Sequence, residues 1–211
     1  MRVMLLGATG LVGGQALRLL LEDVRCTAVI APGRRSLAVQ HAKLHAPLLD
    51  FDQLPPAPDW ARVDAVICAL GTTIAQAGSR AAFRRVDHDY PLAFARLARG
   101  QGAGAFALNS AAGANAGSAI FYSRVKGELE NDLRALAFPS LTLVRPGLIG
   151  GERLQVRRGE QLAARVLGAL GPVLPRAWRI NPAPVIAQAL VAAALDPRPG
   201  EHVVPAKRLA G

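Results

Sequence analysis

The sequence predicts an α/β fold, a doubly wound parallel sheet with helices on both of its faces. Short apolar runs alternate with helix-forming segments along most of the chain, which is the pattern of such a sheet. A glycine-rich turn joins the first apolar run directly to the first helix-forming segment. With 211 residues, 51% of them hydrophobic, the chain has the size of one domain with a substantial core. We therefore expect a single domain over residues 1–211, with a small C-terminal elaboration at about 150–200.

The first expected element is a buried strand over Val3 to Leu6, followed by a tight turn and a helix over 15–22. Gly7 permits a backbone turn that a Cβ would hinder, Gly10 lets a pyrophosphate approach, and Gly13 lets the helix pack closely on the strand. Unpaired N–H groups and the dipole at the helix start favour a bound dianion. A plain tight turn is the alternative, but the strand before the glycines and the helix after them favour a dinucleotide site. The expected phosphate-binding residues are Gly7, Ala8, Thr9, Gly10, Leu11, Val12 and Gly13.

The second expected strand, Thr27 to Ile30, leads into Arg34 and Arg35. An NAD site places Asp or Glu at this point to hold the ribose 2′-hydroxyl, but no acidic residue stands between Arg25 and Leu49. The two guanidinium groups suit a 2′-phosphate instead. A pair of solvated loop arginines is the alternative, because arginine is abundant throughout the chain. The pattern predicts NADP(H) as the cofactor, preferred over NAD(H).

The third and fourth expected strands end in further candidates for cofactor contact. After the third, Ala46 to Leu49, the Asp50 carboxylate could accept from an adenine amino group while Phe51 borders the ring, although a helix cap explains Asp50 nearly as well. The fourth, Ala65 to Leu70, is a continuous apolar run suited to a parallel strand buried on both faces. The small residues that follow would let the chain pass over a cofactor. These strands add Asp50, Phe51, Leu70, Gly71 and Thr72 to the expected cofactor site.

The remaining elements continue the alternation. We expect a long helix from Arg80 to about Arg99, capped by Ser79 and kinked or divided by Pro91. The fifth strand, Ala105 to Leu108, ends at Asn109-Ser110. The other expected elements are a helix over about 119–136, a strand over 141–144, a loop over 150–159, helices over 160–169 and 184–195, and a short strand over 202–204.

The net charge of +10 comes mainly from arginines spread along the chain rather than from one dense basic run. A nucleic-acid interface would combine basic runs with aromatic residues for base stacking. The chain has six Phe, two Tyr and two Trp, most of them within strand or helix patterns. We therefore expect anionic small ligands, rather than nucleic acid, as the partners of this charge.

Cysteine, histidine and hydropathy patterns argue against several other classes of protein. Cys26 and Cys68 fall in strands on either side of the first strand, about 9–10 Å apart, too far for a disulfide, so both are expected as buried free thiols. His41 and His45 have no cysteine partners nearby, and no metal site is expected. No window reaches about 18 consecutive apolar residues and the N-terminus lacks a secretory pattern, so we expect no membrane span and a cytoplasmic location.

Tyr122 and Lys126 are four residues apart on an expected helix, so their side chains share one face. Ser110 ends the preceding strand, where open α/β sheets form ligand crevices. A phenol is a poor base at neutral pH, and a neighbouring ammonium favours its charged form. The serine could hydrogen-bond a substrate oxygen while the tyrosine gives that oxygen a proton or takes one away, and the lysine could reach the nicotinamide ribose. A surface pair is the usual meaning of this spacing, but its place after a glycine fingerprint and a strand-ending serine favours a catalytic set.

Together these residues resemble the short-chain dehydrogenase/reductases, in their extended or atypical branch, and more narrowly the Tat-interacting-protein-like subgroup of atypical members. The resemblance covers residues 1 to about 150, and the tail more loosely. The matching stretches are Gly33-Arg34-Arg35, Leu70 to Thr73, Arg85 to Tyr90, Tyr122 to Glu128 and Arg145 to Gly147.

This resemblance implies a Rossmann fold that binds NADPH through the glycine loop and the two arginines. It also implies a catalytic set of Ser110, Tyr122 and Lys126. The residues implied to border the nicotinamide are Pro146, Gly147, Leu148 and Ile149. The chain departs from the wider family at Asp87, where that family commonly has asparagine, and this argues against an asparagine-based proton relay. The chain is also shorter than usual extended members, which implies a small substrate lobe and argues against a sugar-nucleotide substrate.

Two functions from different classes are consistent with this sequence. The first is an NADPH-dependent oxidoreductase that transfers hydride to a small carbonyl substrate. The second is an NADPH-sensing regulatory protein with little or no catalysis. The complete set of Ser110, Tyr122 and Lys126 favours the first, because a sensor has no need of it. The sequence does not specify the substrate or the direction of the reaction, and it leaves monomer and homodimer both open.

Overall fold

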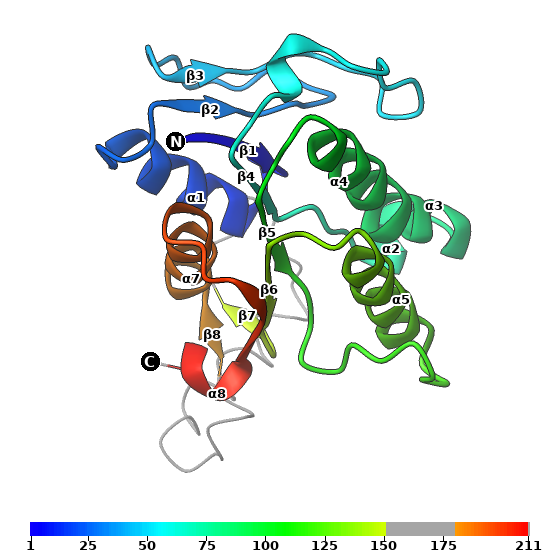
Figure 1. The fold of residues 1–211 in the computed structure, drawn as a ribbon. Coiled ribbons are helices and arrows are strands. Elements are labelled where there is room, and N and C mark those ends of the chain that lie inside the picture. The colour runs from blue at the N-terminus through cyan, green and yellow to red at the C-terminus, as the bar shows by residue number, and fades with distance from the viewer. Residues whose placement is uncertain (151–179, 211) are drawn as a thin grey trace.

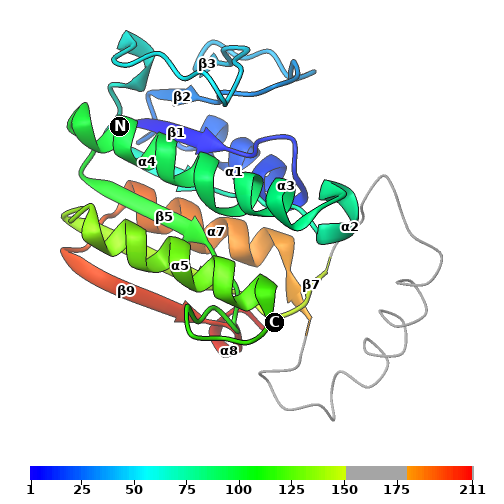
Figure 2. The ribbon, with the colours of Figure 1, turned by 90° about the vertical axis from the view of Figure 1, so that its right-hand side faces the viewer.

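The computed structural model describes residues 1–150 and 180–210. Within these residues, seven parallel strands form one sheet in the order β3-β2-β1-β4-β5-β6-β9, with helices on both faces (Figures 1 and 2). The strands are β1 (Arg2–Leu6), β2 (Ala28–Ile30), β3 (Leu44–His45), β4 (Ala65–Cys68), β5 (Ala105–Asn109), β6 (Ser140–Arg145) and β9 (Gly200–Pro205). Every adjacent pair in this sheet is parallel. The doubly wound parallel sheet that the sequence predicts is therefore confirmed.

The longer helices cover the two faces of the sheet. On one face lie α1 (Leu11–Glu22) and α7 (Ala183–Leu195), and on the other lie α4 (Tyr90–Gly100) and α5 (Phe121–Ala135) (Figure 1). Successive residues of β1 point to opposite faces. Val3 and Leu5 join the core beneath α1 and α7, while Met4 and Leu6 join the core beneath α4 and α5. The shorter elements are α2 (Ile74–Ala77), α3 (Arg80–Arg84), α8 (Ala206–Leu209), the 3₁₀ turn η1 (Asp59–Ala61) and the π-helical turn η2 (Arg85–Asp89).

The third strand lies two residues before its predicted position. Leu44–His45 pairs with β2, whereas the sequence pattern placed this strand at Ala46 to Leu49. Pro47 has no N–H to donate, so the regular ladder ends before it. The Gly33 N–H still bonds to the Pro47 carbonyl at 3.0 Å, and the Leu49 N–H bonds to the Gly33 carbonyl at 2.9 Å. The chain therefore continues alongside β2 in irregular form up to the turn that holds Asp50 and Phe51.

Pro91 divides the helix predicted over 80–99, as expected. The helix α3 ends at Arg84, η2 follows with the Tyr90 N–H bonded to the Arg85 carbonyl, and α4 continues to Gly100. In a regular α-helix the Pro91 ring would press on the carbonyl of residue 87 and leave that carbonyl without a donor. The wider π-helical turn relieves this clash. It also places Asp87 and His88 in the interior, where both are buried.

The carboxyl ends of the parallel strands meet at one edge of the sheet, and a second, small pair of strands lies beyond β6. This pair consists of β7 (Ile149–Gly150) and β8 (Asn181–Pro182), which run in parallel. The buried side chain of Asn181 holds the junction, because its Oδ1 accepts from the Gly147 N–H at 2.7 Å and its Nδ2 donates to the Ala206 carbonyl at 3.0 Å.

Some sequence expectations fall outside the described residues. They are the helix over 160–169, most of the loop over 150–159 and most of the small C-terminal elaboration. Within residues 1–150 and 180–210, no helix has the length and apolar character of a membrane span. Cys26 and Cys68 are buried free thiols, as predicted. Burial raises the pKa of the Cys68 thiol to about 12.

Candidate cofactor and active site

The turn between β1 and α1 requires glycine at two positions. Gly7 has a φ of +85°, and a Cβ built on it would lie 2.7 Å from the backbone of Ala69. A Cβ on Gly13 would lie 2.0 Å from the Gly7 carbonyl oxygen, so α1 packs directly on the turn. Gly10, at φ −81°, is the N-cap of α1, and among the described residues no side chain caps the first N–H groups of this helix. The turn therefore presents free donors and the positive end of a helix dipole to an anion.

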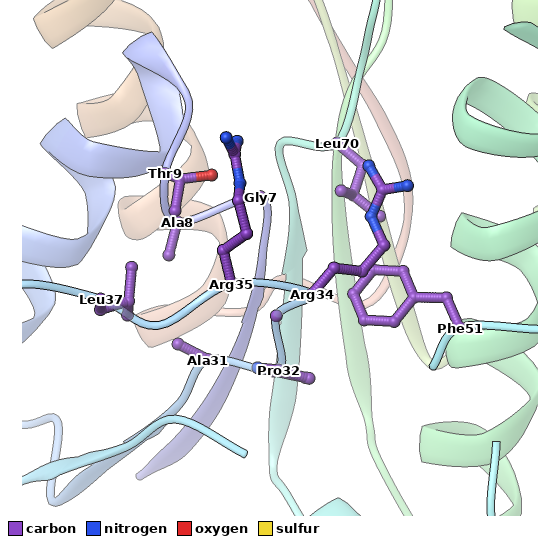
Figure 3. A pocket seen from close by; sticks show the side chains of 11 residues that line it. Gly7, Ala8, Thr9, Ala31, Pro32, Arg34, Arg35, Leu37, Phe51 and Leu70 are labelled. Atoms are coloured by element: carbon purple, nitrogen blue, oxygen red, sulfur yellow. The ribbon is translucent and has the colours of Figure 1, made fainter. Parts of the chain in front are cut away.

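A cavity opens beside this turn at the carboxyl edge of β1 and β2 (Figure 3). The Arg34 guanidinium lies over the Phe51 ring, with Cζ 6.0 Å from the ring centroid. The Arg35 side chain extends past Gly7 and Thr9 (Figure 3). Both arginines are exposed, and within the described ranges neither forms an ion pair with a carboxylate. An aromatic wall, two exposed guanidinium groups and a glycine turn therefore surround one cavity.

The cavity brings together only part of the predicted cofactor set. Its predicted lining residues are Gly7, Ala8, Thr9, Arg34, Arg35, Phe51 and Leu70. It is also lined by residues that the sequence analysis did not select, namely Ala31, Pro32, Gly33 and Leu37. These four residues follow β2 and flank the arginine pair, so their place at the carboxyl end of a strand was the signal that could have found them.

The other predicted cofactor residues lie elsewhere. Asp50 does not line the cavity, and its Oδ1 accepts from the Asp52 N–H at 3.0 Å within a turn. No described helix begins at Asp50, so this contact is not the helix cap that the sequence offered as the alternative. Predicted residues that lie in the glycine turn and the start of α1, away from the cavity wall, are Gly10, Leu11, Val12 and Gly13. Predicted residues that lie in the loops after β4 and β6 are Gly71, Thr72, Pro146, Gly147 and Leu148, and Ile149 begins β7.

Tyr122 and Lys126 lie on one face of α5, as their spacing predicts. Tyr122 is 39% exposed, and its ring packs against Phe83 of α3 with centroids 5.8 Å apart. Lys126 is buried, and its Nζ lies 2.7 Å from Asp87 Oδ1. Burial is the largest single influence on the pKa of Lys126 and lowers it, but the charge of Asp87 and the smaller effects of Tyr122 and the hydrogen bond outweigh it. The pKa of Lys126 is therefore raised, and the ammonium is charged at neutral pH.

Ser110 belongs to a different group of side chains than the sequence predicted. Its hydroxyl donates to Glu130 Oε1 at 2.6 Å, and the same oxygen accepts from Arg145 Nε at 2.9 Å. Ser110 and Glu130 are both buried. In the part of the chain that the structure describes, no hydrogen bond joins Ser110 to Tyr122. The predicted catalytic set is therefore assembled only in part, with Tyr122 and Lys126 together and Ser110 in a buried network with Glu130 and Arg145.

Asp87 and Glu130 are the two carboxylates whose partnerships the sequence analysis missed. Each side chain is 1% exposed, and each holds one predicted catalytic residue. Glu130 follows Lys126 by four residues on α5, so helical spacing could have placed it on the same face. Asp87 stood out only as a departure from the wider family, because nothing local links it to residue 126.

One buried acceptor at the same edge has no donor within residues 1–150 and 180–210. Asn109 ends β5, and its Oδ1 is the one buried side-chain oxygen or nitrogen without a hydrogen-bond partner among the described residues. Leaving such an acceptor unpaired costs about 1–3 kcal/mol. A ligand with an N–H or O–H group at this edge would supply the missing donor. The unpaired acceptor and the glycine turn both fit a bound dinucleotide.

Comparison with known proteins identifies the family. No protein-family model matches the chain. The chain is 35% identical over 214 residues to the mitochondrial protein fmp52 of Aspergillus fumigatus, covering 94% of this chain and 89% of that one. It is 36% identical over 180 residues to protein HTATIP2 of Rattus norvegicus, covering 83% of this chain and 72% of that one. The chain belongs to the atypical short-chain dehydrogenase/reductases of the HTATIP2 type.

Solved structures share the fold of this family member. MoeE5 in complex with UDP-glucose and NAD superposes with a TM-score of 0.72 at 16% identity, covering 96% of this chain and 75% of that one. An oxidoreductase of the short-chain dehydrogenase/reductase family from Burkholderia thailandensis gives a TM-score of 0.66 at 17% identity, covering 100% and 93%. The fold is therefore that of NAD(P)-binding oxidoreductases.

The comparison corrects one expectation from the sequence. The fungal relatives from Aspergillus fumigatus and Emericella nidulans are both named as mitochondrial proteins. The expectation of a cytoplasmic location is therefore wrong. It rested on the lack of a secretory pattern and of a membrane span, and neither of these observations separates the cytoplasm from the inside of an organelle.

Proposed function

We propose that this chain is an NADPH-dependent oxidoreductase that reduces a small carbonyl compound, with Tyr122 as the proton donor. The observation that carries the proposal is the shared edge of the sheet. The glycine turn and the arginine-lined cavity lie at the carboxyl ends of β1 and β2, and the Tyr122–Lys126 pair lies on the helix that follows β5. A dinucleotide laid along this edge would reach from one group to the other.

The cavity supplies the binding part of this function. The turn at Gly7 to Gly13 holds the pyrophosphate through backbone N–H groups and the helix dipole. Arg34 and Arg35 hold the 2′-phosphate, because their guanidinium groups donate in the fork geometry that phosphate oxygens accept. Phe51 borders the adenine ring, and the Arg34 guanidinium lies over the Phe51 ring.

The second part of the edge supplies the proton. When NADPH is bound, it supplies the hydride for the carbonyl carbon. Tyr122 is exposed at the start of α5 and gives its phenolic proton to the carbonyl oxygen as negative charge develops there. The Lys126 ammonium, one helical turn away, adds positive charge beneath the tyrosine and has N–H groups for the nicotinamide ribose. Ser110 has no step in this scheme, since its hydroxyl donates to Glu130.

The burial of Ser110 and Lys126 favours a second function. Both side chains are buried against carboxylates, so the site holds fewer free polar groups than the sequence suggested. An NADPH-sensing protein would need the cavity and the glycine turn but not a free proton-transfer set. This function predicts tight NADPH binding without turnover.

Oxidation of NADPH against a panel of small aldehydes and ketones tests the two functions. The reductase predicts that at least one compound stimulates NADPH oxidation, and that Tyr122→Phe removes this stimulation. The sensor predicts submicromolar to micromolar NADPH binding by calorimetry, with no compound raising the slow background oxidation. An unmodified protein that binds neither NADPH nor NADH contradicts both functions.

A further inference from the structure

The buried ion pair between Asp87 and Lys126 joins three separate parts of the chain. Asp87 Oδ1 lies 2.7 Å from Lys126 Nζ of α5, and the two side chains are 1% and 4% exposed. The other carboxylate oxygen, Oδ2, accepts from the Thr72 N–H at 2.8 Å in the loop that follows β4. A single carboxylate in η2 thus binds both a helix and a loop at the candidate site.

The loop after β4 lies directly against this pair. A Cβ built on Gly71 would be 3.5 Å from Asp87 Oδ1 and 4.0 Å from Lys126 Nζ. Leu70, one residue earlier, lines the cofactor cavity. Leu70, Gly71 and Thr72 therefore connect the cavity wall to Asp87. A change in the Asp87–Lys126 ion pair would alter the position of this loop as well as that of the lysine.

The π-helical turn explains how Asp87 reaches this position. Pro91 prevents a regular helix through residue 87, and η2 replaces it. Asp87 and its neighbour His88 are both buried as a result. His88 makes the outer contacts of the turn, with Nδ1 2.8 Å from Asp89 Oδ1 and Nε2 2.9 Å from Asp132 Oδ2 of α5. The turn is held on both sides, and Asp87 is directed inward.

A carboxylate meets a requirement here that an amide cannot. Two donors converge on residue 87, the Thr72 N–H and the Lys126 ammonium. Aspartate offers one acceptor oxygen to each, whereas asparagine has a single acceptor oxygen and would turn its own N–H₂ group toward one of the donors. A buried ammonium without a counter-ion is also strongly unfavourable.

We propose that Asp87 is the positioning residue of this site, which fixes the Leu70–Thr72 loop and the Lys126 ammonium relative to each other. This inference rests on the proposed function, in which the loop borders the cofactor and the lysine supports the proton donor. Asp87 acts through Lys126 and Thr72 and has no contact with the substrate. Asp87 couples cofactor binding to turnover, because its carboxylate fixes both the loop that borders the cofactor and the lysine that supports the proton donor.

The test compares Asp87→Asn with Asp132→Asn. Asp132 also ties η2 to α5, through His88, but its contacts include neither Lys126 nor Thr72. For Asp87→Asn we expect the dissociation constant for NADPH to rise about tenfold, equal to about 1.4 kcal/mol, and kcat to fall by about tenfold or more. For the matched control we expect both quantities to stay within about twofold. Equal losses in the two variants would show a general effect of loosening η2 and would overturn the proposal.

A double variant separates positioning from stability. Asp87→Asn leaves a buried ammonium unpaired and lowers the melting temperature, whereas Asp87→Asn with Lys126→Met has no unpaired charge. We expect the double variant to regain most of the melting temperature, which would assign the stability loss of Asp87→Asn to the unpaired ammonium rather than to loosening of η2. If Asp87→Asn alone, folded and stable, binds NADPH and turns over like the unmodified protein, Asp87 does not position the site.

The binding measurements keep this proposal distinct from the proposed function. If the unmodified protein reduces no carbonyl compound, the reductase function fails. The NADPH calorimetry of Asp87→Asn against Asp132→Asn still decides whether Asp87 sets the cofactor loop. If the unmodified protein is an active reductase and the two variants behave alike, the positioning role fails and the reductase function stands.

Discussion

The two ends of the carboxyl edge of the sheet are built in opposite ways. At the cofactor end, Arg34 and Arg35 are exposed and, within the described ranges, without carboxylate partners. At the other end, Lys126 and Ser110 are buried, and each is bound by a carboxylate with 1% exposure. The cofactor end is free to accept an anion from solution, while the groups below Tyr122 are already arranged by the fold. Recognition of the 2′-phosphate should therefore depend on the exposed arginines, and turnover on the buried Asp87–Lys126 pair.

The largest expected effect is a loss of turnover without a loss of cofactor affinity, on substitution of Tyr122. Tyr122→Phe keeps the ring that packs on Phe83 and removes only the hydroxyl. We expect turnover to fall by about 10²–10⁴, the usual contribution of a general acid, with NADPH affinity unchanged by calorimetry. Full activity of this variant on a verified substrate would show that the proton donor is another group.

The next effect concerns the cofactor end alone. Replacing Arg34 and Arg35 with alanine removes two charge-assisted contacts to the 2′-phosphate, and we expect NADPH affinity to fall at least about tenfold, or about 1.4 kcal/mol, after solvent screening. NADH affinity should barely change. Arg18→Ala is the matched control, because Arg18 lies on α1 and donates to Gln15 at 2.8 Å outside the cavity. Equal affinities for NADPH and NADH in the unmodified protein would refute the cofactor preference.

Ser110→Ala sharpens the comparison at the buried end. Because the Ser110 hydroxyl donates to the Glu130 carboxylate, we expect its loss to lower the free energy of unfolding by about 1.5–3 kcal/mol, as for hydrogen bonds to charged groups. Turnover should stay within about threefold, since the hydroxyl has no step in the reaction. Denaturant titration and steady-state kinetics measure the two quantities. A drop in turnover of about 10² at unchanged stability would return Ser110 to the catalytic set.

A smaller effect with two opposite signs is expected at Asn109. Asn109→Leu removes the unpaired buried oxygen, so the free protein should gain about 1 kcal/mol in stability. The stabilisation by NADPH should decrease, because the ligand loses an acceptor. Thermal melts with and without NADPH read out both changes. Lower stability of the free variant would mean that the oxygen has a partner in solution.

The smallest effect is expected at the cysteines. Burial raises the pKa of the Cys26 thiol, and burial raises the pKa of the Cys68 thiol to about 12. Only the thiolate reacts with alkylating agents, and at pH 8 it is about one part in 10⁴ of a thiol with a pKa of 12. We expect no modification of either residue in the folded protein, measured by mass spectrometry after iodoacetamide treatment, and full modification of both after unfolding. Rapid labelling of Cys68 at pH 8 would contradict its burial.

The glycine turn and the position of the arginine pair could be predicted because their signals are local in the sequence. The strand, the three glycines and the helix follow one another within about twenty residues, and the arginines come directly after the next strand. The steric reasons for Gly7 and Gly13 are the ones that the spacing suggested. Pro47 shortened the expected third strand in a way that its missing N–H explains. Asp50 lies in a turn, where its Oδ1 accepts from the Asp52 N–H, so it matches neither the predicted cavity contact nor the helix cap.

The buried end could not be predicted because its partners are distant in the chain. Asp87 and Lys126 belong to different helices, and no periodic pattern relates them. Pro91 predicted a division of the helix but not a π-helical turn, and only that turn brings Asp87 inward. Ser110 was correctly expected at the end of β5, yet the direction of its hydroxyl depends on Glu130 and Arg145. Strand ends can be read from a sequence, whereas hydrogen-bond partners far apart in the chain cannot.

The packing of α1 against α7 also has a consequence for how the chain folds. The apolar face of the first helix is completed by a helix that follows it by most of the length of the chain, and both lie in one core cluster. During synthesis the glycine turn and α1 are made before α7, so the part of this face that α7 covers stays open until α7 has left the ribosome. Contacts of such large sequence separation slow folding, because the entropy of closing the long intervening chain is lost before the contacts form. The phosphate-binding turn should therefore reach its final rigidity late, when the end of the chain docks on its beginning.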